Sequence, residues 1–223
     1  MSYLSPLGKL YLAHADKERA VSMAKYMKDN FEYFGIPSPQ RKAIEKEFVK
    51  KFGKPPVAQL PAVIKEAFQK PQCEFQYFII ELTISLRKEL PQGFIKTARF
   101  MLVTKSWWDS VDAIAAYIAG GLVKKYPALA KTMDEWIESG NMWLQRTAIL
   151  HQIRFKKDTD EKRLFNYCLR RASSKEFFIR KAIGWALREY TKTNPDAVRK
   201  FVSEAPLSAF SKKEALKRLD RKK

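Results

Sequence analysis

The chain has 223 residues, 46% of them hydrophobic, which is enough to bury a core and excludes a chain that is disordered by composition. Lys and Arg number 43 against 24 Asp and Glu, so the net charge of +19 favours a polyanionic partner. The excess is concentrated toward the end, because residues 141–223 contain 22 basic and only 9 acidic residues.

Several classes of protein are disfavoured by simple patterns. The longest apolar run, AIAAYIAGGLV at 113–123, is far shorter than the roughly 20 residues of a membrane span. The N-terminal sequence lacks the charged and apolar segments of a signal peptide. Cys73 and Cys168 are far apart and outside any CxxC pattern, so neither a disulfide framework nor a zinc site is expected. We therefore expect a cytoplasmic protein that binds no metal, cofactor or membrane.

The first strong helix signal is SPQRKAIEKEFVKKFG, at residues 38–53. Ser38 is expected as the N-cap, Pro39 at the first helical position and Gly53 as the terminator. Hairpin turns of the NG or DG type between alternating runs are missing, and glycine is scarce. The pattern predicts an all-α protein of about twelve helices.

The stretch TKSWWDSVDAI, at 104–114, predicts a helix with two faces. Trp107, Val111 and Ile114 make an apolar stripe that continues to Ile118. The neighbouring face carries an aromatic side chain and a carboxylate four residues apart, Trp108 and Asp112. Core packing explains the first tryptophan, but it does not explain why the second is paired with a carboxylate.

A repeat runs through these helices. Small or apolar pairs recur with spacings of 35, 35, 35, 34 and 33 residues, at 43–44, 78–79, 113–114, 148–149, 182–183 and 215–216. A period of this length is typical of helical-repeat solenoids. We expect one domain over 1–223, a curved α-solenoid of about six HEAT-like repeats with a basic concave groove, and a plain helical bundle is the alternative.

Later helices add candidate site residues to the same groove. Trp143 is the repeat equivalent of Trp108, and Arg146 follows one turn along. The segment SSKEFFIRKAIGWALREY opens with a serine and Glu176, close to a capping box. Its non-core face carries an aromatic and cationic stripe, formed by Phe178, Lys181, Trp185 and Arg188.

At these motifs the sequence resembles a known family. TKSWWDSVD, WLQRTAIL, SSKEFFIRKAIGWALREY and AKYMKDNFEYFGIPSPQRK are similar to segments of the AlkD-type DNA alkylpurine glycosylases, HEAT-like repeat enzymes of bacteria and archaea. The resemblance implies hydrolysis of the N-glycosidic bond of cationic N3- or N7-alkylated purines in double-stranded DNA. It implies a monofunctional enzyme, and we expect it to act as a monomer on the nucleoid.

The resemblance also assigns roles to residues. It implies that Asp112 is the catalytic carboxylate and that Trp108 and Trp185 are the tryptophans of the cleft. It implies DNA contacts by Arg146, Arg188 and Tyr26. The expectation of DNA contact extends to three further side chains, Lys105, Lys181 and Phe178.

Taken alone, these residues have ordinary explanations. Asp112 would be a solvated or ion-paired helix residue, and Trp185 and Trp143 would pack in the core or at its rim. His14 and His151 are expected to be structural. Two other functions stay open: a non-catalytic solenoid that binds damaged or branched DNA, and a protein-interaction scaffold, which would leave the charge and the tryptophan–aspartate pair unexplained.

Overall fold

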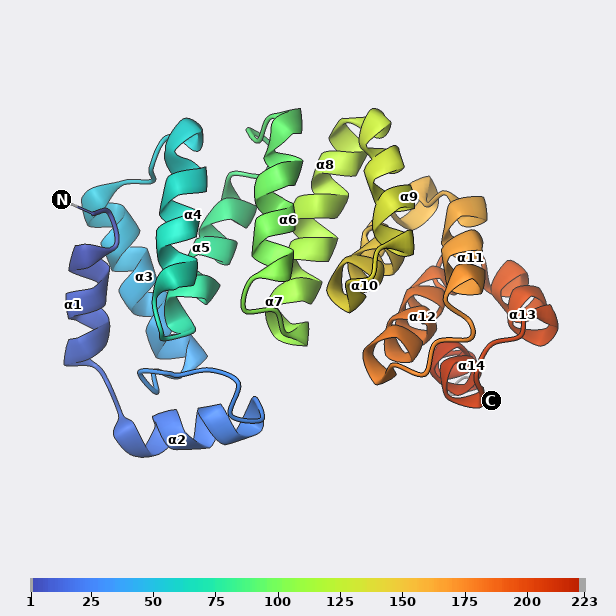
Figure 1. The fold of residues 1–223 in the computed structure, drawn as a ribbon, viewed down its shortest axis with the longest axis horizontal. Helices are drawn as coiled ribbons and strands as arrows, with labels where there is room; N and C mark the ends of the chain where they lie inside the picture. Colours follow the sequence, from blue (N-terminus) through green and yellow to red (C-terminus); the bar gives the residue numbers. More distant parts are fainter. Residues whose placement is uncertain (1, 221–223) are drawn as a thin grey trace. The chain divides into compact units, whose positions relative to one another are not determined.

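The computed structural model describes residues 2–220, and it is built almost entirely from helices (Figure 1). Within this range the only β-structure is an isolated bridge between Glu32 and Gln72. The expected all-α class is therefore confirmed. The chain divides into two compact units, with the boundary after Leu90, and each is described separately. The expectation of one domain with a single concave groove stays a prediction.

The first unit contains five α-helices and a short 3₁₀ turn: α1 (Ser5–Ala13), α2 (Lys17–Tyr26), α3 (Ser38–Phe52), η1 (Val57–Gln59), α4 (Leu60–Gln69) and α5 (Glu74–Ser85). Four of these helices bury apolar or aromatic side chains, whereas α2 has no buried residue and lies across the unit in Figure 1. Gly35 lies against the residue that precedes α2. A Cβ at position 35 would lie 2.1 Å from the carbonyl oxygen of Asp16, so only glycine fits there.

The second unit contains the remaining helices: η2 (Gln92–Phe94), α6 (Ile95–Val103), α7 (Trp108–Ala113), η3 (Ile114–Ala119), α8 (Gly120–Lys125), η4 (Pro127–Leu129), α9 (Ala130–Glu138), α10 (Met142–Leu150), η5 (Lys156–Asp158), α11 (Glu161–Arg170), α12 (Phe177–Tyr190), α13 (Pro195–Glu204) and α14 (Ala209–Leu216). In this unit α10 packs against both α7 and α12, and α12 packs against α14. Consecutive repeats are therefore in direct contact through these four helices.

The segment from α7 to α8 is one continuous helix with a π-helical middle. Its π-helical turns, Ile114–Ala119, begin two residues after Asp112. Such insertions are rare and occur frequently at functional sites. Gly120 follows the π-helical turns and permits close packing, because a Cβ there would lie 2.1 Å from the carbonyl oxygen of His151.

The repeat pairs lie in the six helices that the period predicts, and they are mostly buried. Ile79, Ile114, Ile149 and Ile183 are between 0% and 1% exposed. The first repeat differs, because Ala43 of α3 is exposed. There the core face is rotated, and it buries three other side chains, Arg41, Glu45 and Phe48.

Arg41 and Glu45 explain the rotation of α3. Arg41 Nη1 donates to Glu45 Oε1 at 2.6 Å, and its Nη2 donates to Glu81 Oε1 at 2.8 Å. The hydroxyl of Tyr11 also donates to Glu45, at 2.5 Å. Buried charges are stable only when they are paired in this way, and the pattern of apolar residues does not report such pairing.

The sequence predicts the end of α3 correctly. Gly53 ends α3 with a positive φ of 72°, as expected. The capping predictions were wrong at two helix starts. Ser38 is the first residue of α3 rather than its N-cap, and α12 starts at Phe177 with Glu176 as an N-cap that makes no side-chain capping bond.

Candidate active site

Trp108 and Asp112 lie on the short helix α7, which begins just after a turn of unusual backbone geometry. Lys105 in this turn has a φ of +48°, and Trp107 is extended and forms the N-cap. A non-glycine residue at positive φ is uncommon and costs conformational energy, so its neighbours must hold it in place. Trp108 then forms the first turn, and Asp112 follows four residues later on the same side of the helix.

Asp112 forms a bidentate ion pair with Arg146 of α10. Arg146 Nε donates to Asp112 Oδ1 at 2.7 Å, and Arg146 Nη2 donates to Asp112 Oδ2 at 2.8 Å. The side chain of Asp112 is 16% exposed and that of Arg146 is 3% exposed. Two parallel bonds fix both the position and the plane of the carboxylate, which a single contact would not do.

Arg146 also reaches the next repeat. Its Nη1 donates to the backbone carbonyl oxygen of Phe178 in α12 at 2.5 Å. One guanidinium therefore joins α7, α10 and α12. The expected contact of Arg146 with DNA stays a prediction. In the structure its side chain is buried between these helices, and its nitrogens are bound to Asp112 and Phe178.

An aromatic cluster lies beside this ion pair. The ring centroids of Trp107, Trp143 and Phe178 are 5.1 to 5.9 Å apart. The guanidinium carbon of Arg146 lies 5.9 Å from the centre of the Phe178 ring. Trp107 was expected in the core stripe, but it packs in this cluster and is partly exposed, whereas Val111, Ile114 and Ile118 are fully buried as expected.

Burial changes the acidity of Asp112. It raises the pKa of the Asp112 carboxyl above the ordinary aspartate value, and the nearby charge of Asp109 acts in the same direction. The hydrogen bonds and positive charge of Arg146 lower the pKa and oppose this effect. The carboxylate is therefore poorly hydrated and depends on Arg146 to remain ionised.

A second charged cluster lies on α12. Lys181 and Arg188 are seven residues apart, and Trp185 lies between them on the same face. Both cations are partly exposed, and both are bound by Glu214 of α14, which is 7% exposed. Sequence reasoning did not single out Glu214, because a glutamate beside several lysines is typical of a solvated helix surface. A usable signal was present, since Glu214 occupies the repeat position of Asp112, Thr147 and Lys181, at spacings of 35, 34 and 33 residues.

Tyr26 belongs to the first unit. It is the last residue of α2, and 70% of its surface is exposed. It borders a shallow hollow of about 240 Å³, together with Met23, Met27, Tyr33 and Tyr77. Its expected contact with DNA stays a prediction, as do those of Lys105 and Phe178.

Two further features bear on ligands. Within residues 2–220, no group of three or more histidine, cysteine, aspartate or glutamate side chains is arranged to hold a metal ion. None of the helices in that range has the length and hydropathy that crossing a membrane requires.

His151 is buried, and its Nδ1 lies 2.6 Å from the carbonyl oxygen of Ala148 in the same turn of the chain.

The chain matches known proteins along most of its length. It is similar to a solved structure described as a predicted DNA alkylation repair enzyme from Enterococcus faecalis, with 32% identity, a TM-score of 0.84 and coverage of 92% of this chain and 96% of the other. None of the curated proteins compared with the chain matches it.

Two structures from Streptococcus mutans share the fold at lower identity. AlkD2 is 18% identical with a TM-score of 0.58, and covers 78% of this chain and 85% of its own. The protein smu.31 is 18% identical with a TM-score of 0.59, and the match covers 93% and 96%. The family model for DNA alkylation repair enzymes matches residues 9–219, so the chain belongs to the DNA alkylation repair enzyme family.

Proposed function

We propose that this protein is a DNA glycosylase that removes cationic N3- or N7-alkylated purines from double-stranded DNA. Membership of the family supports a role in alkylation repair. The finer assignment is supported by one observation, the carboxylate of Asp112 held by both of its oxygens in a mostly buried position. In a protein that only binds DNA, a carboxylate opposes phosphate binding unless it holds DNA-contacting cations in place, and the side chain of Arg146, which Asp112 binds, is only 3% exposed.

The chemistry needs only one carboxylate. A purine alkylated at N3 or N7 carries a positive charge, so it leaves as a neutral base without being protonated. As the N-glycosidic bond breaks, positive charge develops on the deoxyribose, and a nearby carboxylate stabilises it. Water then bonds to the anomeric carbon and loses a proton, which leaves an abasic site. This corresponds to one half of the carboxylate pair of a glycosidase, because the general acid is not required.

Asp112 is suited to this task by its environment. A carboxylate with little hydration interacts more strongly with a developing cation than one in bulk water. The bidentate pair with Arg146 orients the carboxylate and keeps it ionised, so Arg146 acts as a positioning residue. Asp112 can stabilise the sugar by its charge, orient the attacking water, or do both.

The tryptophans and cations supply the rest of the proposed site. Indole faces attract cations, so Trp108 and Trp185 would favour a positively charged sugar and exclude water from it. Lys181 and Arg188 would bind phosphates, and so would Lys105, whereas Phe178 and Tyr26 would pack against the DNA backbone. Phosphate contacts position a protein without reading sequence, as an enzyme that scans a genome requires. The enzyme would act as a monomer on the DNA of a bacterial or archaeal cytoplasm.

The test is release of free base from duplex DNA with a single N7-methylguanine, using wild type and Asp112→Asn. We expect release by wild type and a decrease of roughly 10²–10³-fold in the variant, as found when one electrostatic stabiliser is removed. DNA affinity should stay equal or increase, because a negative charge is lost. Equal rates of base release by both proteins would show that Asp112 is not the catalytic carboxylate. Binding without release by either would leave a non-catalytic DNA-binding protein.

A further inference from the structure

Glu214 is a nearly buried carboxylate that binds three cations. Its Oε2 accepts a hydrogen bond from Lys181 Nζ and another from Arg188 Nη1, both at 2.8 Å. Its Oε1 lies 3.5 Å from Lys217 Nζ. These contacts lower the pKa of Glu214 to about 2, with the bond from Lys181 as the largest cause. Glu214 is therefore ionised at any pH at which the protein would bind DNA.

The position of Glu214 depends on close packing between α12 and α14. A Cβ at Gly184 would lie 2.5 Å from Glu214 Cβ and 3.0 Å from the carbonyl oxygen of Ser211. A real Cβ atom essentially never lies within 3.0 Å of such a neighbour, so only glycine permits this approach. Ser211 adds a bond from its hydroxyl to the carbonyl oxygen of Arg180 at 3.0 Å. Helix α14 therefore approaches α12 at Gly184, the residue immediately before Trp185 in the sequence.

The two bound cations keep most of their capacity to donate. The side chain of Lys181 is 36% exposed and that of Arg188 is 28% exposed. An ammonium has three donors and a guanidinium has five, and Glu214 takes one from each. The exposed parts of both side chains can reach a ligand while Glu214 holds one donor of each. Trp185 lies between the two cations on α12, so one carboxylate fixes the charged side chains on both sides of that tryptophan.

We propose that Glu214 is a positioning residue for DNA binding, which holds Lys181 and Arg188 on either side of Trp185 for contact with phosphates. This inference rests on the proposed function and adds α14 to the site, although α14 need not touch DNA. Two long side chains that are already ordered lose less conformational freedom when phosphate binds. The gain in preorganisation outweighs the cost of one negative charge near the phosphates.

The proposal predicts that removing Glu214 changes the DNA affinity in the direction opposite to the one that simple electrostatics predicts. If Glu214 only neutralised charge, its removal would tighten DNA binding, and this effect would fade at high salt because of screening. If it positions the cations, its removal weakens binding, and the loss persists at high salt. A purely structural Glu214 would lower the stability of the protein without changing the affinity of the folded fraction.

The experiment measures the dissociation constant for an undamaged duplex by fluorescence anisotropy over a range of salt concentrations. We expect Glu214→Ala to weaken binding by about tenfold, since two rotamer-rich side chains must then be ordered on binding. Glu214→Gln keeps one acceptor oxygen and the side-chain shape, so its DNA affinity should fall less than that of Glu214→Ala. Thermal unfolding followed by circular dichroism gives the folded fraction of each variant.

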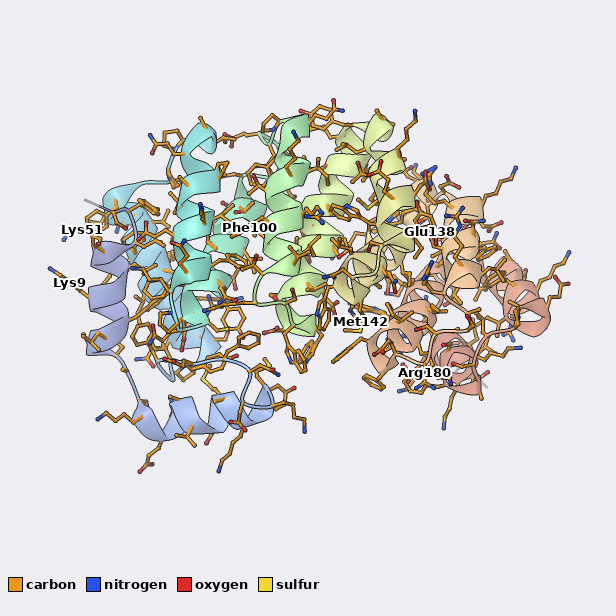
Figure 2. The ribbon with its side chains drawn as sticks, in the orientation of Figure 1. Lys9, Lys51, Phe100, Glu138, Met142 and Arg180 are labelled. Carbon is orange, nitrogen blue, oxygen red and sulfur yellow. The ribbon has the colours of Figure 1, made fainter. Side chains whose placement is uncertain are left out.

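Glu138 of α9 offers a matched control. It binds two arginines, with Oε1 and Arg170 Nη1 at 2.9 Å and Oε2 and Arg171 Nη2 at 2.5 Å. Figure 2 labels Glu138 beside α11, apart from Arg180 at α12 and α14. Glu138→Ala removes the same charge, so it should leave binding unchanged or slightly tighter. A loss of affinity specific to position 214 would separate positioning from charge.

Two other results for the Glu214 variants would overturn the proposal. Tighter binding by Glu214→Ala, or unchanged binding with lower stability, would reduce Glu214 to a charge or packing role. The readout uses undamaged DNA, so it does not depend on catalysis. A wild type that binds DNA but releases no base would contradict the proposed glycosylase and leave this inference standing. A wild type that binds no DNA would overturn both.

Discussion

Gly184 of α12 and Glu214 of α14 form a tight contact between two neighbouring helices, in which a Cβ on Gly184 would lie 2.5 Å from Glu214 Cβ. No rotamer change relieves such an overlap, because Cβ positions are set by the backbone. The contact brings the last helix into the charged cluster on α12. It also explains why glycine, a poor helix former, lies in the middle of α12.

We expect Gly184→Ala to destabilise the protein by about 1–3 kcal/mol, as overpacking does in other cores. The same change should weaken DNA binding by displacing Glu214 from Lys181 and Arg188. Gly121→Ala is the matched control, since a Cβ at Gly121 of α8 would meet nothing within 4 Å. It should stabilise the protein by about 0.5–1 kcal/mol through helix propensity. Urea denaturation measures the free energy of unfolding of both variants. Equal stabilities would contradict the packing argument.

Replacing Arg146 should alter the pH dependence of base release. Asp112 acts when ionised, so activity is lost as pH falls through its pKa, which burial raises and Arg146 lowers. Arg146→Ala removes the lowering effect, so the acidic limb of the profile should move to higher pH. Arg146→Lys keeps the charge but not the paired bonds, and its limb should lie between those of wild type and Arg146→Ala.

The same change should affect stability. Arg146→Ala leaves the Asp112 carboxylate buried without its partner, which costs about 3 kcal/mol or more in comparable pairs. Single-turnover release across pH, corrected for spontaneous depurination, gives the profile, and thermal unfolding gives the stability. An acidic limb that coincides with that of wild type would show that Arg146 does not control the ionisation of Asp112.

His151 should make stability depend on pH below neutrality. Burial lowers its pKa from 6.5 to about 4, because the folded protein disfavours the charged ring. In the unfolded chain the ring takes up a proton near pH 6.5, so the free energy of unfolding falls as pH decreases from 6.5 to 4. The total loss is about 3 kcal/mol, and the contribution of neutral His151 is fully present above pH 6.5.

Denaturant unfolding at several pH values tests this dependence. His151→Gln should flatten the slope between pH 6.5 and 4, because glutamine does not titrate there. His14→Gln changes an exposed histidine and serves as the control for replacing a histidine as such. If His151→Gln keeps the full slope, another group is responsible for it.

Trp185 should contribute to the rate through its aromatic face. Trp185→Phe keeps a ring with a weaker attraction for cations, and Trp185→Leu removes the ring. We expect base release to slow from wild type to Phe to Leu, by roughly 2- to 30-fold in total, which corresponds to the usual 0.5–2 kcal/mol of a cation–π contact. Single-turnover rates at saturating enzyme measure the effect. Equal rates for all three proteins would restrict Trp185 to binding.

Part of this structure can be predicted from the sequence alone. The spacing of apolar pairs places Ile79, Ile114, Ile149 and Ile183 in buried positions, because a helix of fixed pitch presents the same face at regular intervals. The scarcity of turn and strand signals predicts an all-helical chain. Several segments, among them the one around Trp108 and Asp112, resemble a known family, and the family model over residues 9–219 confirms that resemblance.

Other features depend on distances between helices, which helical periodicity does not contain. Arg146 is a typical surface residue by sequence, but α7 and α12 cover it on both sides and convert it into the partner of Asp112. Trp107 precedes its helix, so the helical face assigned to it does not apply. Glu214 meets its cations only because Gly184 lets α14 approach α12. The sequence by itself determined the helices, their period and the chemical groups available. Only the tertiary structure decided which charges are paired, because pairing requires contact between residues 26 to 34 positions apart.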